Sequence, residues 1–150
     1  MAGLGECCRD QQKIGMEAMQ GLHLKRQACI LLIDDDALVA AMGQAMLVCL
    51  GVDDVVVHTC SLKALRAFQE APQDFDLVLM DLDMPDMTGA ALACQLWQIR
   101  PHMPIILCTG SATMTWEKAQ RLGFGFLLKK PFGLSDLGVA IEQNFPQRTV

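Results

Sequence analysis

The sequence predicts an α/β domain in which helices cover both faces of a parallel β-sheet. Between residues 28 and 145, short apolar runs of strand length alternate five times with segments of helical length. The strand-like runs are apolar at consecutive positions, a pattern typical of strands that are buried on both faces. Strands that alternate with helices pair in parallel through right-handed crossovers, which place helices on both sides of the sheet.

The five predicted strands are short and rich in Val, Ile and Leu. They comprise residues 28–33, 55–59, 76–80, 104–108 and 126–129. The first is followed directly by three consecutive aspartates, and the others end at Thr59, Met80, Cys108 and Lys129.

One predicted helix follows each strand. The helices comprise residues 37–50, 61–68, 89–99, 115–122 and 135–145. Glycine or proline after the first four of them provides stop signals. Asp36 is the predicted N-cap of the first helix, and Ser135 that of the last, with Asp136 in its first turn.

The remaining residues flank this single domain. Residues 1–27 mix glycines with charges and are predicted to form an extension that is flexible or partly helical. The domain itself is expected to span residues 28–147, followed by a tail of residues 148–150. No secretory signal opens the chain, and the longest uncharged stretch, residues 37–52, is short for a membrane span. We therefore expect a cytoplasmic protein without membrane insertion.

Composition argues against a nucleic-acid-binding protein and against a disulfide-bonded or metal-binding role for the cysteines. The net charge is −5, and the basic residues form no cluster of the kind that phosphate contacts need, which argues against nucleic-acid binding. The seven cysteines include no C-x-x-C pair, and several lie inside apolar runs. They are interpreted as free thiols in a reducing compartment.

Polar residues follow four of the predicted strands. Doubly wound sheets bind ligands outside the carboxyl ends of their strands, so these positions are the candidate site. The residues are Asp34 to Asp36 after the first strand, Asp81 after the third, Thr109 after the fourth and Lys130 after the fifth. Carboxylates gathered at one edge repel one another unless a cation lies among them, and oxygen ligands favour Mg²⁺, with Mn²⁺ as a substitute, over zinc.

Such a group of residues is suited to phosphoryl transfer. One carboxylate can act as the nucleophile toward a phosphoryl group, while Lys130 and the hydroxyl of Thr109 balance charge on its oxygens. Asp36 has two interpretations, a third metal ligand or the helix N-cap, and the cap is favoured.

Four segments resemble the motifs of response regulator receiver domains, the CheY-like superfamily. They are Ile-Leu-Leu-Ile-Asp34-Asp35-Asp, Leu-Val-Leu-Met-Asp81-Leu-Asp-Met-Pro85-Asp-Met-Thr-Gly89, Ile-Ile-Leu-Cys-Thr109-Gly and Lys130-Pro131-Phe132. Residues 76–131 are similar to the receivers of hybrid sensor histidine kinases. The resemblance implies a flavodoxin-like, three-layer α/β/α fold with strand order 2-1-3-4-5.

The resemblance also implies a role for each matching residue. Asp81 matches the phosphorylated aspartate. Asp34 and Asp35 match the acidic pair that holds the metal, together with the backbone carbonyl of Asp83. Thr109 matches the switch hydroxyl and Lys130 the site lysine. Pro85 and Gly89 shape the loop after Asp81, and Pro131 follows a cis peptide bond.

The sequence departs from the family pattern before the lysine. The family usually has an aromatic residue three positions earlier, where this chain has Leu127, with Phe126 one position before it. Either the aromatic coupling is absent, or the doubled lysine marks a shift that makes Lys129 the site lysine. Lys130 is favoured because it directly precedes Pro131.

The implied function is a two-component receiver that takes phosphoryl from a phosphohistidine and switches conformation to control a downstream protein effector. Its expected donor is a sensor histidine kinase or a histidine phosphotransfer protein, and its expected state is a monomer or weak dimer. It would catalyse only its own phosphorylation and dephosphorylation. Two alternatives remain open: a phosphatase of the haloacid-dehalogenase type, suggested by Asp81-Leu-Asp83, and a receiver-like interaction scaffold that works without phosphorylation.

Overall fold

The computed structural model describes residues 28–145, which form one five-stranded parallel sheet. The predicted extension and tail lie outside the described residues. The strand order is β2-β1-β3-β4-β5, which confirms the predicted architecture. The strands are β1 (Cys29–Ile33), β2 (Asp54–His58), β3 (Leu77–Asp81), β4 (Ile105–Thr109) and β5 (Phe126–Lys129).

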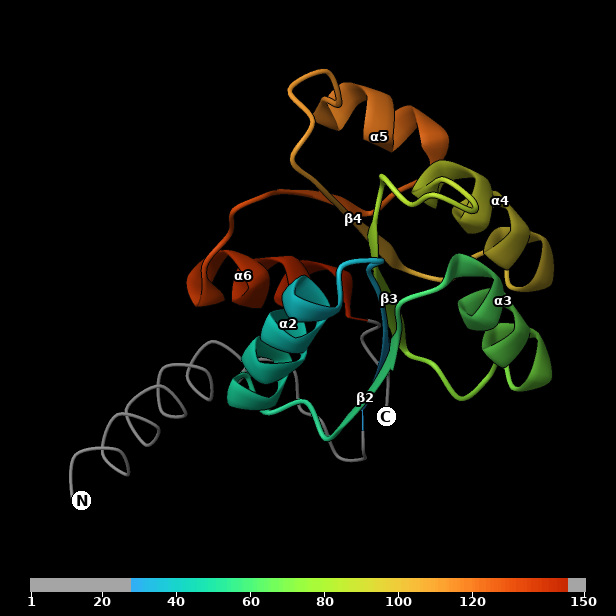
Figure 1. Cartoon of the computed structure of the whole chain (residues 1–150), viewed down its shortest axis with the longest axis horizontal. Helices are drawn as coiled ribbons and strands as arrows, with labels where there is room; N and C mark the ends of the chain where they lie inside the picture. The colour runs from blue at the N-terminus through green and yellow to red at the C-terminus, as the bar shows by residue number, and fades with distance from the viewer. Residues whose placement is uncertain (1–27, 146–150) are drawn as a thin grey trace.

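Five helices cover the two faces of this sheet. They are α2 (Ala37–Cys49), α3 (Ser61–Glu70), α4 (Gly89–Ile99), α5 (Trp116–Leu122) and α6 (Leu134–Asn144). Helices α2 and α6 lie on one side of the strands, whereas α3, α4 and α5 lie on the other (Figure 1). The domain is therefore a three-layer α/β/α sandwich.

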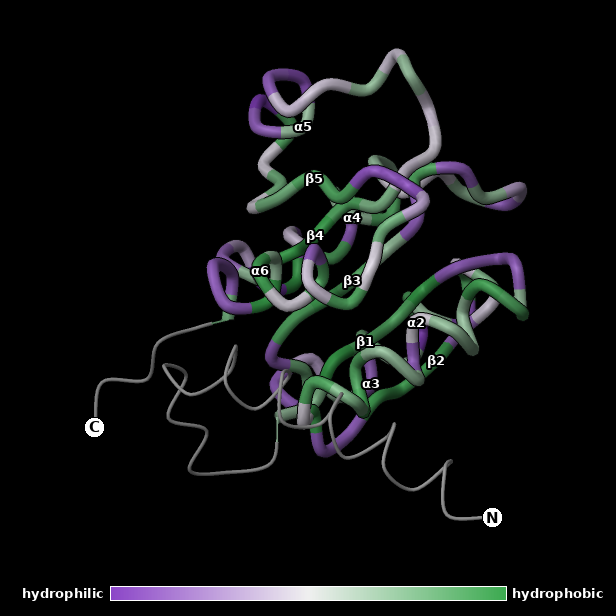
Figure 2. Tube along the Cα trace, turned by 90° about the vertical axis from the view of Figure 1, so that its left-hand side faces the viewer, coloured by the Kyte–Doolittle hydropathy of each residue, from purple (hydrophilic) through white to green (hydrophobic). Residues whose placement is uncertain are grey.

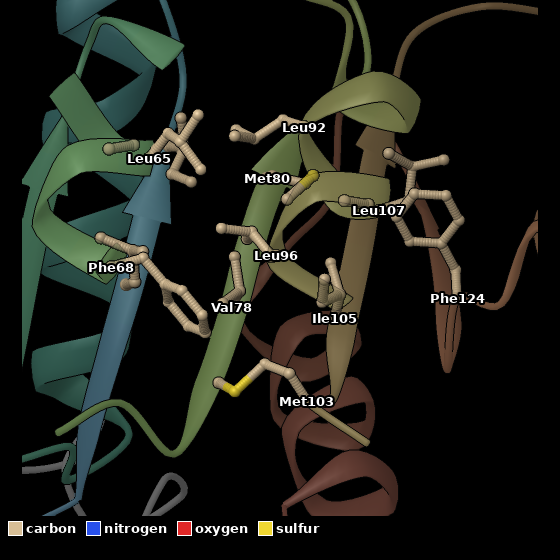
Figure 3. Packing of buried hydrophobic residues seen from close by; sticks show 14 of the residues in the cluster. Leu65, Phe68, Val78, Met80, Leu92, Leu96, Met103, Ile105, Leu107 and Phe124 are labelled. Atoms are coloured by element: carbon tan, nitrogen blue, oxygen red, sulfur yellow. The ribbon is translucent and has the colours of Figure 1, made fainter. Parts of the chain in front are cut away.

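Alternate residues of each strand supply two separate cores. On the α3–α4–α5 side, Met80 and Leu107 pack with Leu96, Phe68 and other buried side chains (Figure 3). The second core lies between the sheet and α2 and α6, and its members include the buried strand residues Ile30, Leu79 and Ile106. Each fully buried side chain of this size contributes roughly 1.5–3 kcal/mol by leaving water, so the consecutive apolar residues of the strands stabilise both layers.

Figure 2 shows the result as hydropathy, with hydrophobic strands through the centre and hydrophilic residues gathered in the loops and outer helices.

Two helix starts test the predicted caps. The carboxylate of Asp36 accepts hydrogen bonds from the backbone N–H groups of Leu38 and Val39, so Asp36 is the N-cap of α2. The prediction for Ser135 was wrong, because α6 begins at Leu134 and its N-cap is Gly133. The carboxylate of Asp136 accepts the Gly133 N–H at 2.9 Å, and this contact sets the first turn one residue earlier.

Two further findings concern the cysteines and the helices. Among the described residues, Cys29, Cys49, Cys60, Cys94 and Cys108 are all free thiols. Within residues 28–145, every helix is too short, or too polar, to cross a bilayer.

Candidate phosphoryl-acceptor pocket

Three aspartates meet at the carboxyl edge of the sheet. Asp81 is the last residue of β3, and Asp34 and Asp35 directly follow β1, which pairs with β3 through Ile33 and Met80. Asp34 and Asp81 are buried, with exposed fractions of 4% and 7%, whereas Asp35 is exposed. Ligand oxygens of the three carboxylates lie within 4.8 Å of one another.

Lys130 joins two of these carboxylates. Its ammonium group donates to Asp34 Oδ2 at 2.7 Å and lies 3.2 Å from Asp81 Oδ1. The backbone N–H of Lys130 donates to the Thr109 carbonyl at 2.9 Å, which places Lys130 directly beyond the end of β5. The peptide bond between Lys130 and Pro131 is cis, as the resemblance implied.

Lys129 takes a different position from Lys130. Its ammonium donates to the backbone carbonyls of Ser111 and Met114, in the loop between β4 and α5. Successive strand residues face opposite sides of a sheet, so the two lysines diverge. The geometry favours Lys130 as the lysine of the carboxylate pocket.

Burial and charge act together on the pKa values of this pocket. Burial raises the pKa of Asp81; the hydrogen bond and charge of Lys130 oppose that rise without cancelling it, and the charges of Asp34 and Asp35 add to it. Burial alone would lower the pKa of Lys130, but the hydrogen bonds and charges of Asp34 and Asp81 reverse the direction and raise it. A single ammonium thus leaves the three carboxylates incompletely neutralised.

The donor set fits a hard divalent cation. Three carboxylates and one ammonium give a formal charge of −2 in this pocket (−3 + 1). Oxygen donors without Cys or His suit Mg²⁺ and Mn²⁺. Asp36 is engaged in capping α2 and lies outside this group, which supports the cap interpretation over the third-ligand one. The side chain of Asp83 is exposed and is also outside the group.

Thr109 lies at the end of β4 with its side chain on the α3–α4–α5 side. The residue has no exposed surface, and its hydroxyl oxygen accepts the Ser111 N–H at 2.9 Å. Leu127 packs on the same side of the sheet, while Phe126 packs against the core under α2 and α6. Phe126 therefore does not replace the missing aromatic residue beside Thr109.

The loop between β3 and α4 folds tightly under Asp81. The N–H of Gly89 donates to the Leu82 carbonyl at 2.8 Å. A Cβ at Gly89 would lie 2.5 Å from the carbonyl oxygen of Asp81 and 3.0 Å from Leu82 Cα. Both neighbours are backbone atoms that have little freedom to move. Pro85 lies exposed in the same loop, whereas Met84 is buried.

Gly89→Ala is therefore expected to destabilise the domain by about 2 kcal/mol or more, as overpacking does in close-packed sites. Thermal unfolding followed by circular dichroism measures the effect. Gly110→Ala is the matched control, because a Cβ added at Gly110 would lie 4.0 Å from its nearest neighbour, the Cβ of Lys130. Equal unfolding midpoints for the two variants would contradict the close approach at Gly89.

Sequence reasoning missed the connection between Lys129 and Ser111. The usable signal was strand register: Thr109 pairs with Lys129, so both side chains lie on one face of the sheet. The loop conformation that brings the Ser111 carbonyl to the ammonium had no such signal in the sequence.

Comparison with known proteins agrees with this architecture. Residues 30–142 match the family model described as the response regulator receiver domain. The chain is 30% identical over 134 residues to transcription factor SKN7 of Chaetomium thermophilum, covering 85% of this chain and 17% of that protein. It is 31% identical over 110 residues to the cell cycle response regulator CtrA of Brucella ovis, covering 72% and 46%. The chain thus spans less than half the length of these two relatives.

A solved structure gives the same result. The response regulator receiver domain protein of Clostridium thermocellum superposes with a TM-score of 0.73 at 30% identity. The match covers 78% of this chain and 93% of that one.

Proposed function

The chain belongs to the response regulator receiver domain family, and from this premise we propose that Asp81 accepts a phosphoryl group from a phosphohistidine on a partner protein. Receiver domains have a phosphoacceptor role in two-component signalling. The observation that supports Asp81 is its place at the end of β3, beside the Lys130 ammonium and two further carboxylates.

The chain's own groups suit an in-line transfer. Lys130 contacts Oδ1 of Asp81, so Oδ2 is the proposed nucleophile. The bond from Oδ2 to phosphorus forms as the phosphorus–nitrogen bond breaks, and the imidazole leaves as the neutral ring because its other nitrogen carries a proton. Lys130 balances the charge of the transferred group, and the Thr109 hydroxyl donates a hydrogen bond to it.

The acidic residues complete the site. Asp34, Asp35, Asp81 and the backbone carbonyl of Asp83 would hold Mg²⁺, or Mn²⁺ in its place, and the bound ion supplies positive charge against the phosphoryl oxygens. In this proposal the domain catalyses only its own phosphorylation and dephosphorylation.

The proposal is tested by incubating the full chain with acetyl phosphate and Mg²⁺ and measuring intact mass. We expect one added phosphoryl group, carried by the peptide that contains Asp81. When a chelator removes the metal during labelling, we expect no added group. A label on another residue would overturn the assignment. No labelling from small or protein donors, with partner binding retained, would favour the scaffold alternative.

The surface of α2 supports a protein donor. This helix has no charged side chain in its 13 residues, and it exposes Leu38 and Met42 with fractions of 72% and 54%. Beside it lies an apolar hollow of about 300 Å³ lined by residues that include Met42, Phe132 and Lys130. Because Lys130 also contacts Asp81, this apolar surface adjoins the phosphoryl pocket. We propose that the phosphohistidine protein docks here.

Met42→Glu is expected to slow phosphoryl transfer from a phosphohistidine protein by roughly tenfold, because a charge would replace a central apolar contact. Labelling by acetyl phosphate, which needs no docking, should keep its rate. Val48→Glu is the matched control, since Val48 is 55% exposed on the same helix but lies toward its other end. A similar loss with both donors would contradict docking on α2.

The remaining expectations stay proposals. Residues 28–147 would be the receiver domain of a cytoplasmic protein that acts as a monomer or weak dimer and controls a protein effector. The two curated relatives described above are named as a transcription factor and a cell cycle regulator.

A further inference from the structure

Lys129 connects the edge strand β5 to the loop between β4 and α5. Its ammonium donates to the Ser111 carbonyl at 2.9 Å and also to the Met114 carbonyl. Bonds from a charged donor are stronger than bonds between neutral groups, and two acceptors converge here on one ammonium. Lys129 thereby holds two points of the loop three residues apart.

Ser111 connects Lys129 to Thr109. Its carbonyl accepts from Lys129, while its N–H donates to the Thr109 hydroxyl oxygen at 2.9 Å. Its own side chain pairs with the Thr113 hydroxyl at 2.8 Å. Both backbone polar groups of Ser111 are therefore committed, one to Lys129 and one to Thr109.

The Thr109 hydroxyl is oriented by this arrangement. A hydroxyl has one proton and two acceptor lone pairs. One lone pair is engaged by the Ser111 N–H, so the proton stays available to a different acceptor. Thr109 is fully buried, which excludes bulk water as a competitor. Leu127, the neighbour of Lys129 on this face of β5, has no polar atom with which to hold the loop.

We propose that Lys129 is a positioning residue for phosphoryl acceptance. By holding the Ser111 carbonyl, it keeps the Ser111 N–H on the Thr109 oxygen, and so directs the hydroxyl proton toward a phosphoryl group on Asp81. This inference rests on the proposed function of Asp81. It assigns distinct roles to the two adjacent lysines: Lys130 balances charge in the pocket, and Lys129 orients its hydroxyl donor.

A double-mutant cycle tests the connection. The rate of labelling by acetyl phosphate is measured for Lys129→Met, Thr109→Ala and the double variant, in the full chain with Mg²⁺. We expect Lys129→Met to slow labelling by roughly three- to tenfold, the scale of one ordinary hydrogen bond. Because Lys129 acts through Thr109, the double variant should be no slower than Thr109→Ala alone.

Two further variants separate positioning from general loop stability. Lys129→Arg keeps several N–H donors and should restore most of the rate. Lys118→Met removes another lysine that donates to this loop, at the Thr113 carbonyl and 2.9 Å, and should label like the wild type. In the absence of a phosphoryl donor, hydrogen exchange of the Ser111 backbone amide should be faster in Lys129→Met than in Lys118→Met.

The outcomes distinguish this inference from the proposed function. If the wild type is not labelled at Asp81, the proposed function fails. If the wild type is labelled, four results overturn the role of Lys129. The first is labelling of Lys129→Met at the wild-type rate, and the second is rate losses that multiply in the double variant. The third is a Lys129→Arg variant that labels no faster than Lys129→Met, and the fourth is a Lys118→Met variant that loses as much rate as Lys129→Met.

Discussion

Asp81→Asn is expected to abolish phosphoryl acceptance, with a labelling rate at least 10³-fold below that of the wild type, as loss of a nucleophile does. The amide has nearly the same shape as the carboxylate but is a far weaker nucleophile. Intact mass spectrometry after incubation with acetyl phosphate and Mg²⁺ measures the effect. A variant that labels as fast as the wild type would remove Asp81 from the mechanism.

In metal-free buffer the same variant should be at least as stable as the wild type, so that lost labelling cannot be attributed to an unstable fold. Burial and the neighbouring carboxylates raise the pKa of Asp81 in the folded state. A group whose pKa rises on folding stabilises the fold most below its unfolded pKa, and that contribution is lost as the pH rises through the folded pKa. At neutral pH the ionised carboxylate therefore opposes folding, and the neutral amide removes this cost.

A matched control is Asp83→Asn. Asp83 is two residues away, and its exposed side chain lies outside the carboxylate group, while its proposed contribution is a backbone carbonyl. This variant should label at a rate close to that of the wild type. Both substitutions remove one negative charge from this region, but only Asp81→Asn removes the proposed nucleophile. The contrast between the two rates therefore distinguishes loss of the nucleophile from loss of charge.

Lys130→Met is expected to slow labelling by about 10²-fold, comparable with removing one preorganised donor from a charged transition state. Its ammonium contacts Asp34 and Asp81 at 2.7 and 3.2 Å, and methionine keeps the apolar stem while deleting the charge. Labelling by acetyl phosphate measures the rate, with Mg²⁺ at saturation so that a change in metal affinity is not mistaken for chemistry.

Lys130→Met should also be less stable than the wild type in metal-free buffer, by about 2 kcal/mol. Removing one partner of a buried ion pair leaves its counter-charges uncompensated, and the partial exposure of Lys130 reduces the loss. Adding Mg²⁺ should raise the unfolding midpoint more in the variant, because its pocket carries a formal charge of −3 instead of −2. An equal Mg²⁺ response in both proteins would contradict the role of Lys130 in charge balance.

The sequence was sufficient for the fold because its strongest signals are local. Consecutive apolar residues such as those of β3 cannot be buried unless both faces of the strand are covered. Alternation with helical segments then restricts the sheet to parallel crossovers. The helix bounds were less accurate. The second predicted helix ends at Phe68, whereas α3 continues to Glu70. Pro72 excludes helix interior only at its own position and beyond, so it sets the latest possible end of the helix and not the actual one.

The members of the pocket were also predictable, for a topological reason. Residues that directly follow parallel strands meet at one edge of the sheet, so Asp34, Asp81 and Lys130 converge without any knowledge of loop structure. Asp36 could be separated from the others because a carboxylate directly before a helix is the usual cap.

The sequence by itself therefore determined the layers, the strand order implied by its motifs, and the carboxylates of the candidate site. Tertiary structure decided what depends on side-chain direction and loop path. It placed the Lys130 ammonium on Asp34 and that of Lys129 on the Ser111 carbonyl. It also made Gly133 the cap of α6, through a contact with Asp136. The physical reason is that strand periodicity fixes the face of each side chain, whereas its partner depends on loops that have no periodicity.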